Sequence, residues 1–414
     1  MSLFRKVCHF QLLLYLSIIL AFFATAKAQS SEAPLIRSET TPVQNLKVFD
    51  ALWEKVNTKY FDAKFNGINW LQMRDIYRPK AEKAANQQEL LAILKQMLRE
   101  LKTSHLDIWQ TVSKTKISKQ IFTNFNPNDD FLYLSYGFSL KNIEGKPVIR
   151  EVVPNSSAQS NGLKNGWILL SANGKLLTDN DFNIGEVYEG RQIDLRFLDT
   201  ENKEHNKTLT ANWAVRKRIR SGYLFNQEIG YIKFDGFVAG ISKWLEYEIK
   251  PLNSMKAIIL DLRNNQGGYL EEVKKCLSFF FAEDIEFGTF IERSGKTKET
   301  KVKGKRKKAF NGKIIVLIDD ESFSGAEIFA NLMQETGRGK VVGVASRGFV
   351  LNSIEYNLPE NFKVSIAFRD YLSPKGKRIE GKGVTPDLEV FPKINDIISN
   401  RDAILEKALE ITDL

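Results

Sequence analysis

The chain has 414 residues and a formal net charge of +10, with 43% hydrophobic and 27% charged residues. This composition excludes a disordered or collagen-like chain, and the length favours two or three domains. The two cysteines exclude a fold held together by many disulfide bonds, so stability must come from packed cores. No cluster of cysteines and histidines has the spacing of a zinc site, and we expect neither a metal ion nor an organic cofactor.

The N-terminus has the order of a secretory signal. Two basic residues precede an apolar run, which ends at a small-residue site for cleavage after Ala28. An uncleaved membrane anchor is the alternative, but the run is short for a span and a polar segment follows it at once. We predict a signal peptide over residues 1–28, a periplasmic or extracellular protein, and no transmembrane segment after cleavage. The mature chain keeps Cys276, which we expect to be a small core residue on a helix.

The following segment changes from polar to helical. Residues 29–44 are polar, carry two prolines and are predicted to be a linker. Apolar residues then recur every three or four positions over residues 45–61 and again over residues 86–105, which is the spacing of amphipathic helices. We therefore predict a helical domain over residues 45–111.

Short strand-like runs replace the helical pattern from Phe131. They include "KPVIREVV" and "GWILLSANGK", separated by Gly, Pro, Asn and Asp, and they predict a β domain over residues 128–212. Beyond it, short apolar strands such as "KAIILDLR" alternate with helical stretches, which favours a parallel α/β core over residues 213–392. Residues 393–414 are predicted to form a closing helix. The expected fold class is α+β with several domains.

Two turns between a strand and a helix carry residues suited to chemistry. In "DLRNNQGGYL", Gly267 and Gly268 let the backbone turn sharply at the carboxyl end of a strand, where free N–H groups can hold an oxyanion. In "VLIDDESFSGAEIF", Ser324 precedes Gly325 and a helix whose first N–H groups lack partners within the helix. The simpler alternatives are a structural turn and a serine, Ser322 or Ser324, that only caps the helix.

Together, these turns resemble those of the tail-specific, or C-terminal-processing, serine peptidases of family S41. The resemblance rests on "DLRNNQGG", "ESFSGAEIFANLMQETGRGKVVG" and "GKGVTPD", and it covers most of the mature chain. It implies that Ser324 is the nucleophile. The backbone N–H of Gly325, with that of Gly267 or Gly268, would then form the oxyanion hole.

The middle β segment resembles a PDZ domain. "VVPNSSAQSNGLKNGWILLSANGK" is similar to the PDZ core, although Trp167 stands where an aspartate is usual. "YGFSL" is similar to the loop that binds a peptide carboxylate. The resemblance implies that this domain binds an extended C-terminal peptide segment by strand addition. The residues carried over are Tyr136, Gly137, Phe138, Ser139 and Leu140.

The catalytic base is the point at which the sequence departs from the lysine-dependent branch of the family. Phe349 occupies the position of the lysine, and a phenylalanine cannot accept a proton. "TSH", which ends in His105, resembles instead the tricorn-protease branch, in which a serine–histidine pair acts with a late glutamate. By this resemblance His105 takes the proton from Ser324, Ser104 fixes the tautomer of His105, and Glu380 orients Ser104. A histidine suits the role because its ordinary pKa is near neutrality.

Simpler interpretations of these residues stay open. In the first interpretation, Glu380 only forms an ion pair with Lys377 or Lys382. In the second, Ser104 only caps the end of a helix. Of the other two histidines, one lies in the signal, and His205 is expected in a hairpin exposed to water.

The predicted function is a secreted serine endopeptidase acting on peptides or unstructured protein tails. A first alternative keeps the activity but takes Lys340 or Lys375 as the base. A second is a catalytically silent peptide-binding protein. A third alternative is that the protein docks on an anionic surface through the basic run Lys296–Lys308. The simpler interpretation of this run is a hairpin exposed to solvent. No aromatic residues interleave with this run for base stacking, and we expect no nucleic-acid partner.

Overall fold

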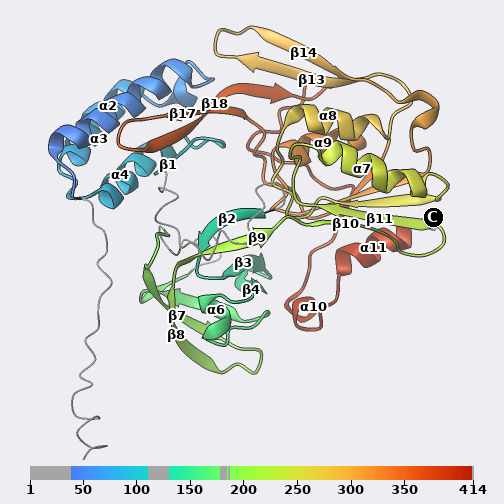
Figure 1. The fold of residues 1–414 in the computed structure, drawn as a ribbon, viewed down its shortest axis with the longest axis horizontal. Coiled ribbons are helices and arrows are strands. Elements are labelled where there is room, and N and C mark those ends of the chain that lie inside the picture. Colours follow the sequence, from blue (N-terminus) through green and yellow to red (C-terminus); the bar gives the residue numbers. More distant parts are fainter. Residues whose placement is uncertain (1–38, 111–129, 178–183, 185–186, 413–414) are drawn as a thin grey trace, which may run out of the picture. The chain divides into compact units, whose positions relative to one another are not determined.

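Three helices open the described part of the chain, which comprises residues 39–110, 130–177, 184 and 187–412 of a computed structural model (Figure 1). The predicted signal peptide lies outside the described residues. From Thr40 onward the chain forms one unit. No helix within the described ranges is long and apolar enough to cross a membrane. The opening helices are α2 (Pro42–Lys59), α3 (Trp70–Glu82) and α4 (Gln87–Arg99), with a 3₁₀ turn, η1 (Phe65–Gly67), after α2.

Helix α2 begins at Pro42, two residues before the predicted end of the linker at residue 44. The Thr41 side chain accepts a hydrogen bond from the Gln44 N–H, and Pro42 has the backbone angle that a first helical turn needs. Helices α2 and α4 confirm the two predicted amphipathic helices. Helix α3 was not predicted, because it buries only Trp70, Tyr77 and Ala81.

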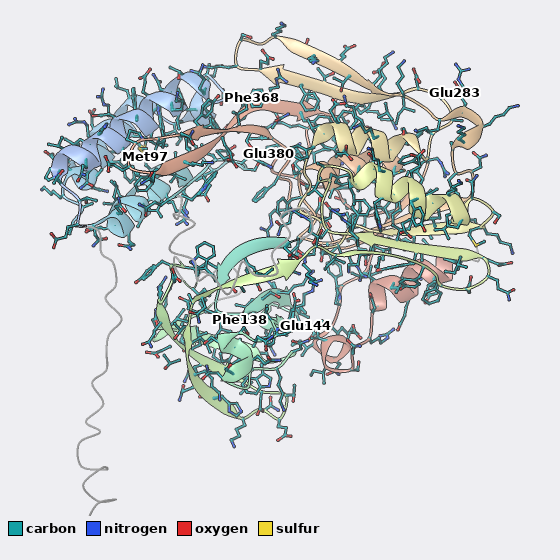
Figure 2. All side chains as sticks on the ribbon, in the orientation of Figure 1. Met97, Phe138, Glu144, Glu283, Phe368 and Glu380 are labelled. Atoms are coloured by element: carbon teal, nitrogen blue, oxygen red, sulfur yellow. The ribbon has the colours of Figure 1, made fainter. Side chains whose placement is uncertain are left out.

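The opening helices share their core with strands from the far end of the sequence. Strand β1 (Asp107–Gln110) pairs antiparallel with β18 (Phe362–Leu372), which also pairs with β17 (Asn352–Asn357). The buried Met97, labelled in Figure 2, belongs to one hydrophobic cluster with Val364 and Ile366 of β18. The predicted helical segment 45–111 therefore ends in a strand, and its apolar faces need residues 351–367 to become buried.

This sheet has the strand order β1-β18-β13-β14, with β13 at Ile285–Glu292 and β14 at Thr297–Val302. The basic run lies in β14 and in the 3₁₀ turn η3 (Arg306–Lys308). Its lysines are mostly exposed, and Lys303 pairs with Asp284 at 2.6 Å. The solvated hairpin is thus the structure that this run adopts.

A second sheet has the order β3-β4-β5-β7-β8 and a core of its own. Buried residues of this core include Ile149, Leu169 and Phe197. Strand β3 lies at one edge of the sheet. A separate pair, β2 (Asp130–Ser135) with β9 (Asn212–Lys217), leads into and out of it. The remaining elements are β3 (Phe138–Ile143), β4 (Lys146–Val152), α6 (Ser157–Ser160), β5 (Ile168–Ala172), β6 (Lys175–Leu176), β7 (Gln192–Leu198) and β8 (Glu204–Thr210).

His205 has a structural role in this second sheet. Its ring stacks on Trp167 with centroids 4.6 Å apart, and its Nε2 lies 2.7 Å from Asp199 Oδ2. His205 lies in the predicted hairpin, formed by β7 and β8, but its ring is only partly exposed because the large indole at position 167 covers one face of the imidazole. Trp167 is itself buried.

The third sheet, of order β10-β11-β12-β15-β16-β19, confirms the predicted parallel α/β core. All neighbouring pairs are parallel except β10 with β11. Its strands are β10 (Arg220–Leu224), β11 (Ile229–Phe234), β12 (Ala257–Asp261), β15 (Lys313–Ile318), β16 (Lys340–Gly343) and β19 (Leu388–Glu389). Its helices are α7 (Ile241–Ile249), the 3₁₀ turn η2 (Lys250–Leu252), α8 (Leu270–Ser278) and α9 (Gly325–Glu335).

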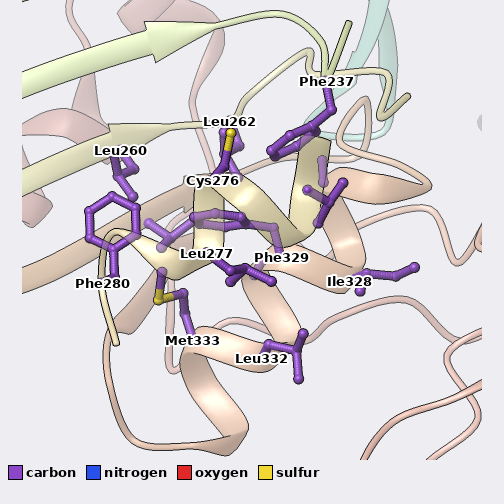
Figure 3. Packing of buried hydrophobic residues seen from close by; sticks show 14 of the residues in the cluster. Phe237, Leu260, Leu262, Cys276, Leu277, Phe280, Ile328, Phe329, Leu332 and Met333 are labelled. Atoms are coloured by element: carbon purple, nitrogen blue, oxygen red, sulfur yellow. The ribbon is translucent and has the colours of Figure 1, made fainter. Parts of the chain in front are cut away.

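Alternate residues of the central strands face two different hydrophobic clusters. Ile258 and Leu260 pack with α7, α8 and α9, whereas Ile259 packs with the C-terminal helix. Figure 3 shows Leu260, Cys276 and Phe329 in the first cluster. Cys276 is fully buried on α8, as predicted for a small core residue on a helix. Both faces of the sheet are therefore covered, as the continuous apolar runs of its strands require.

The closing segment is two helices instead of the single predicted one. They are α10 (Ile394–Ile398) and α11 (Ala403–Thr412). The chain turns between them at Asn400, whose φ of 55° is left-handed. Asp402 then accepts a hydrogen bond from the Leu405 N–H and pairs with Arg263 at 2.7 Å. This ion pair fixes the start of α11 beside β12.

Candidate active site

The two predicted turns lie side by side at one edge of the parallel sheet. Strands β12 and β15 are neighbours, so the segments that follow their carboxyl ends meet, as sites in such sheets commonly do. The Phe323 N–H donates to the Asn265 carbonyl at 3.1 Å, and the Phe237 N–H donates to the Gly267 carbonyl at 2.6 Å. Backbone hydrogen bonds therefore join the glycine turn both to the turn before Ser324 and to the segment after β11.

Ser324 has a strained backbone at the start of α9. Its φ of 59° and ψ of −121° are rare for a residue with a side chain and are held only where the surroundings enforce them. The enforcing group is Glu327, which is fully buried and whose Oε2 accepts the Ser324 N–H at 3.0 Å. Glu327 is part of the quoted motif, but the sequence analysis assigned it no role. Its spacing of three residues from a helix-starting serine is the signal that could have identified it.

Glu327 also gathers a distant loop. It accepts hydrogen bonds from the Ser346 hydroxyl at 2.6 Å, the Gly348 N–H at 2.5 Å and the Phe349 N–H at 2.7 Å. Burial raises the pKa of Glu327, although these donors act against the rise. The carboxylate thus ties residues 346–349 to the turn that carries Ser324.

The glycine turn approaches Ser324 so closely that no side chain fits between them. A Cβ on Gly267 would lie 2.5 Å from the Gly325 nitrogen and 2.6 Å from the Ser324 Cβ. The Gly268 nitrogen lies 3.4 Å from the position that a Cβ on Gly325 would take. The glycines are needed here for the closeness of the two backbones as well as for their positive φ angles.

Two backbone N–H groups converge beside Ser324 without acceptors. The Gly267 N–H donates to Asn265 Oδ1 at 2.9 Å, so it is occupied. Within the described ranges, neither the Gly268 N–H nor the Gly325 N–H has a hydrogen-bond acceptor. Free donors at a helix start are suited to a developing negative charge.

His105, Ser104 and Glu380 form a hydrogen-bonded chain. Ser104 Oγ donates to Glu380 Oε2 at 2.9 Å and lies 2.9 Å from His105 Nδ1. Glu380, which is labelled in Figure 2, is buried, and its Oε1 also accepts the Ser104 N–H at 3.1 Å. Because the single hydroxyl proton goes to the carboxylate, His105 Nδ1 must carry a proton and donate to Ser104 Oγ. Nε2 is then the unprotonated, basic nitrogen.

Burial keeps the His105 ring neutral. Loss of solvent around it lowers its pKa from 6.5 to about 4. The backbone of His105 has a φ of 55°, a left-handed conformation that is uncommon for a histidine. The ring is therefore held, in its neutral form, at a strained position just beyond α4.

The serine turn and the histidine cluster are linked through consecutive backbone groups. The Phe349 N–H donates to Glu327, and the next N–H along the chain, that of Val350, donates to Glu380 Oε2 at 2.9 Å. The side chains of Ser324 and His105 make no direct hydrogen bond in this structure. The network thus brings all four predicted catalytic residues into one connected region.

The late motif "GKGVTPD" packs against the same loop. The Gly381 N–H donates to the Gly348 carbonyl at 2.7 Å, and the Val384 N–H donates to Ser346 Oγ at 2.8 Å. A Cβ on Gly383 would lie 2.2 Å from the Ser346 carbonyl oxygen. The motif therefore positions Glu380 by fixing the backbone on either side of the loop.

The two lysines of the alternative mechanism lie at the other end of α9. Lys375 Nζ donates to the carbonyl of Glu335, the last residue of α9, at 2.9 Å. Lys340 is exposed. It follows Gly339, whose N–H donates to the Met333 carbonyl near the same end of α9. Helix α9 has 11 residues and therefore spans about 16 Å. Ser324 precedes its first residue, so both lysines lie at the opposite end of the helix from Ser324. Glu380 forms no ion pair with either neighbouring lysine in the part of the chain that the structure describes.

The predicted peptide-binding residues lie at the edge of the second sheet. Tyr136 is buried in its core, and Gly137 has a φ of 92°. The Gly137 carbonyl accepts the Val153 N–H at 2.8 Å. Phe138, Ser139 and Leu140 follow in β3, the edge strand, so a second extended segment can pair beside them.

A buried ion cluster joins this edge strand to the turn before Ser324. Lys141 Nζ of β3 lies 2.9 Å from Asp319 Oδ2, with both side chains almost fully buried. Asp319 Oδ1 accepts the Asn264 N–H at 2.9 Å, which lies on the glycine turn. Burial alone would raise the pKa of Asp319, but Lys141, the Asn264 N–H and Arg150 outweigh it and lower the pKa. One carboxylate thus connects the second sheet with both turns of the site.

Comparisons with known proteins show which family models and relatives the chain is similar to. Residues 228–390 match the model of peptidase family S41, and residues 44–99 match that of the tricorn protease C1 domain. The chain is 24% identical over 290 residues to the carboxy-terminal processing protease CtpB of Bacillus subtilis strain 168, covering 66% of this chain and 58% of the relative. It is 24% identical over 383 residues to the carboxyl-terminal-processing protease of Synechocystis sp. strain PCC 6803, covering 87% of this chain and 84% of the relative.

A solved structure extends the likeness to the fold. The chain resembles mature CPAF with a TM-score of 0.67 and 12% identity, over 90% of this chain and 97% of that one. The chain spans 58% of the length of the Bacillus relative, so the two proteins differ in extent.

Replacing Gly267 by alanine will destabilise the protein more than replacing Gly174. Both glycines have nearly the same φ, 76° and 77°, so each alanine suffers left-handed strain of about 1 kcal/mol. A Cβ at Gly174 meets nothing within 4 Å, whereas one at Gly267 collides with the Ser324 turn. We expect a total loss of about 3 kcal/mol for Gly267→Ala, measured by urea unfolding. Equal losses in the two variants would contradict this packing argument.

Lys141→Met will leave Asp319 without its nearest cation. We expect the free energy of unfolding at neutral pH to fall by about 3 kcal/mol, a typical cost of breaking a buried pair. Because the pKa of Asp319 is lowered in the folded state, the pair's contribution is present at neutral pH and is lost in acid. The difference from wild type should therefore narrow as the pH falls below about 4. Lys303→Met, at an exposed pair, is the control and should change stability little.

Proposed function

Because residues 228–390 match the model of peptidase family S41, we propose that the chain is a secreted serine endopeptidase that acts on peptides or unstructured protein tails. One observation carries this proposal: the strained Ser324 has two free backbone N–H groups beside it and is linked by hydrogen bonds to a neutral histidine. This arrangement supplies a nucleophile, a site for an oxyanion and a base.

In the first half of the reaction Ser324 Oγ attacks the carbonyl carbon of the scissile bond. His105 Nε2 accepts the hydroxyl proton as the C–O bond forms. The Gly268 and Gly325 N–H groups stabilise the negative charge that develops on the carbonyl oxygen. The intermediate then collapses, the C–N bond breaks, and His105 returns the proton to the leaving amine. An acyl group remains on Ser324.

The second half of the reaction repeats these roles with water. His105 takes a proton from a water molecule, which attacks the acyl carbonyl. The same two N–H groups hold the oxyanion, the bond to Ser324 Oγ breaks, and His105 reprotonates that oxygen. The Ser324–His105 hydrogen bond absent from this structure would form when substrate is bound, as catalytic contacts often tighten only then.

Ser104 and Glu380 serve as positioning residues in this mechanism. Nδ1–H donates to Ser104 Oγ, and the Ser104 hydroxyl donates to the carboxylate, so the tautomer of His105 is fixed. The cation that forms when His105 accepts a proton is stabilised through this relay. The relay thus performs the part that an aspartate plays in a serine–histidine–aspartate triad.

The second sheet would deliver the substrate. We assign it a PDZ-like role because its edge strand β3 follows the Tyr136–Gly137 turn and is free to pair with an extended segment. Strand β3 also carries Lys141, which contacts Asp319 before the nucleophile. A bound tail at this edge would therefore lie on the element that supports the active-site turn.

Labelling with a fluorophosphonate probe tests the proposal directly. We expect the probe to modify Ser324 in the wild-type protein, as located by mass spectrometry. His105→Ala should slow labelling by about 100-fold or more, because the base that activates the serine is removed. His205→Ala is the matched control, since that histidine bonds to Asp199 outside the site. A folded wild-type protein that is never labelled, but still binds peptide tails, would show a silent peptide-binding protein instead.

The pH dependence of kcat/KM should report the low pKa of His105. The base acts only when neutral, so activity should fall as the pH drops through about 4, not through the ordinary value of 6.5. Peptide hydrolysis between pH 3 and 8 measures this limb, with circular dichroism at each pH to separate loss of activity from unfolding. An acid limb centred near pH 6.5 in the folded protein would contradict the burial of the ring.

A further inference from the structure

A cavity of about 180 Å³ lies beside the glycine turn. It is formed at the carboxyl ends of β11 and β12, and Gly267 is one of its walls. Gly267 also packs directly against Ser324 and Gly325, so a single residue separates the cavity from the serine turn. Its other lining residues are Arg216, Arg218, Asp235, Gly236, Val238, Asn264 and Gln266.

Two arginines and one aspartate line this cavity. Asp235 is already engaged, because its Oδ2 accepts the Ile219 N–H of the segment before β10 at 2.9 Å and its Oδ1 lies 4.0 Å from Arg218. Arg216 is three-quarters covered, and its described ion pair is with Glu151 at 3.4 Å. Glu151 is about half exposed, and such a pair contributes roughly 0–1 kcal/mol, so a better-placed carboxylate can replace it at little cost.

Arg216 is suited to a carboxylate for a geometric reason. It lies on β9, and Arg218 follows the end of that strand; both arginines line the cavity. A guanidinium group offers two parallel N–H donors to the two oxygens of a carboxylate. The amide side chains of Asn264 and Gln266 line the same cavity and can pair with the peptide backbone next to that carboxylate.

We propose that this cavity is a substrate subsite that binds a carboxylate of the peptide through Arg216. The proposal rests on the peptidase function and adds a substrate class to it. The carboxylate is either an Asp or Glu side chain at a fixed position from the cleaved bond, or the C-terminal carboxylate of the peptide. Both present the same two oxygens to the guanidinium group.

The test maps cleavage sites in unfolded casein by mass spectrometry and then measures kcat/KM for matched peptides. Each peptide found in the digest is remade with its Asp or Glu replaced by Asn or Gln, and separately with an amidated C-terminus. The first arm reports a side-chain carboxylate, and the second reports a terminal one. Wild type is compared with Arg216→Met, Arg216→Lys and Arg196→Met. Arg196 is the matched control, since it pairs with Glu204 at 3.5 Å on the second sheet.

We expect wild type to prefer the carboxylate peptide in one of the two arms by roughly tenfold to a hundredfold, the range of a charge-assisted hydrogen bond. Arg216→Met should abolish this preference, Arg216→Lys should keep part of it, and Arg196→Met should keep all of it. Cleavage by wild type without preference in either arm, or a preference that survives Arg216→Met, overturns the subsite alone. Absence of any cleavage by wild type overturns the proposed function and the subsite with it.

Discussion

Two neighbouring backbone N–H groups, those of Phe349 and Val350, hold the site together because they donate to two different buried carboxylates. Glu327 receives the first and supports the strained turn of Ser324, while Glu380 receives the second and supports Ser104. Successive residues of one loop thus link the turn of Ser324 to the cluster of Ser104 and His105. Both carboxyl groups are buried, so each lost donor would leave a polar oxygen without a partner in a medium of low polarity.

This constraint also explains why position 349 tolerates a phenylalanine. The contact that Phe349 makes with Glu327 uses its backbone N–H and not its side chain. The ring packs edge-on against Phe323 beside Arg347. In the proposed mechanism the proton goes to a histidine from the far end of the chain, so the side chain at 349 has no proton to accept.

The sequence predicted what depends on local patterns and missed what depends on pairing between distant segments. The parallel strands and the helices α2 and α4 follow from hydrophobic spacing, and the cluster residues Ser104, His105 and Glu380 came from a resemblance. The strand β1, by contrast, is four residues long and exists only because β18 pairs with it. The break at Asn400 was missed for a similar reason, since Asp402 is held by Arg263 of a remote strand end.

The proposed oxyanion donors are a second case in which contacts between distant segments decided what the sequence left open. Two adjacent glycines looked equivalent in the sequence, and only the side chain of Asn265 distinguishes them by taking the Gly267 N–H. Asn265 is itself fixed by the Phe234 carbonyl at 2.8 Å, at the end of β11. The choice of Gly268 as a donor thus depends on where the neighbouring strand ends. The Arg216 cavity opens at that same strand end, so one register in the sheet sets both the place of the oxyanion and the place of the charge that we assign to substrate recognition.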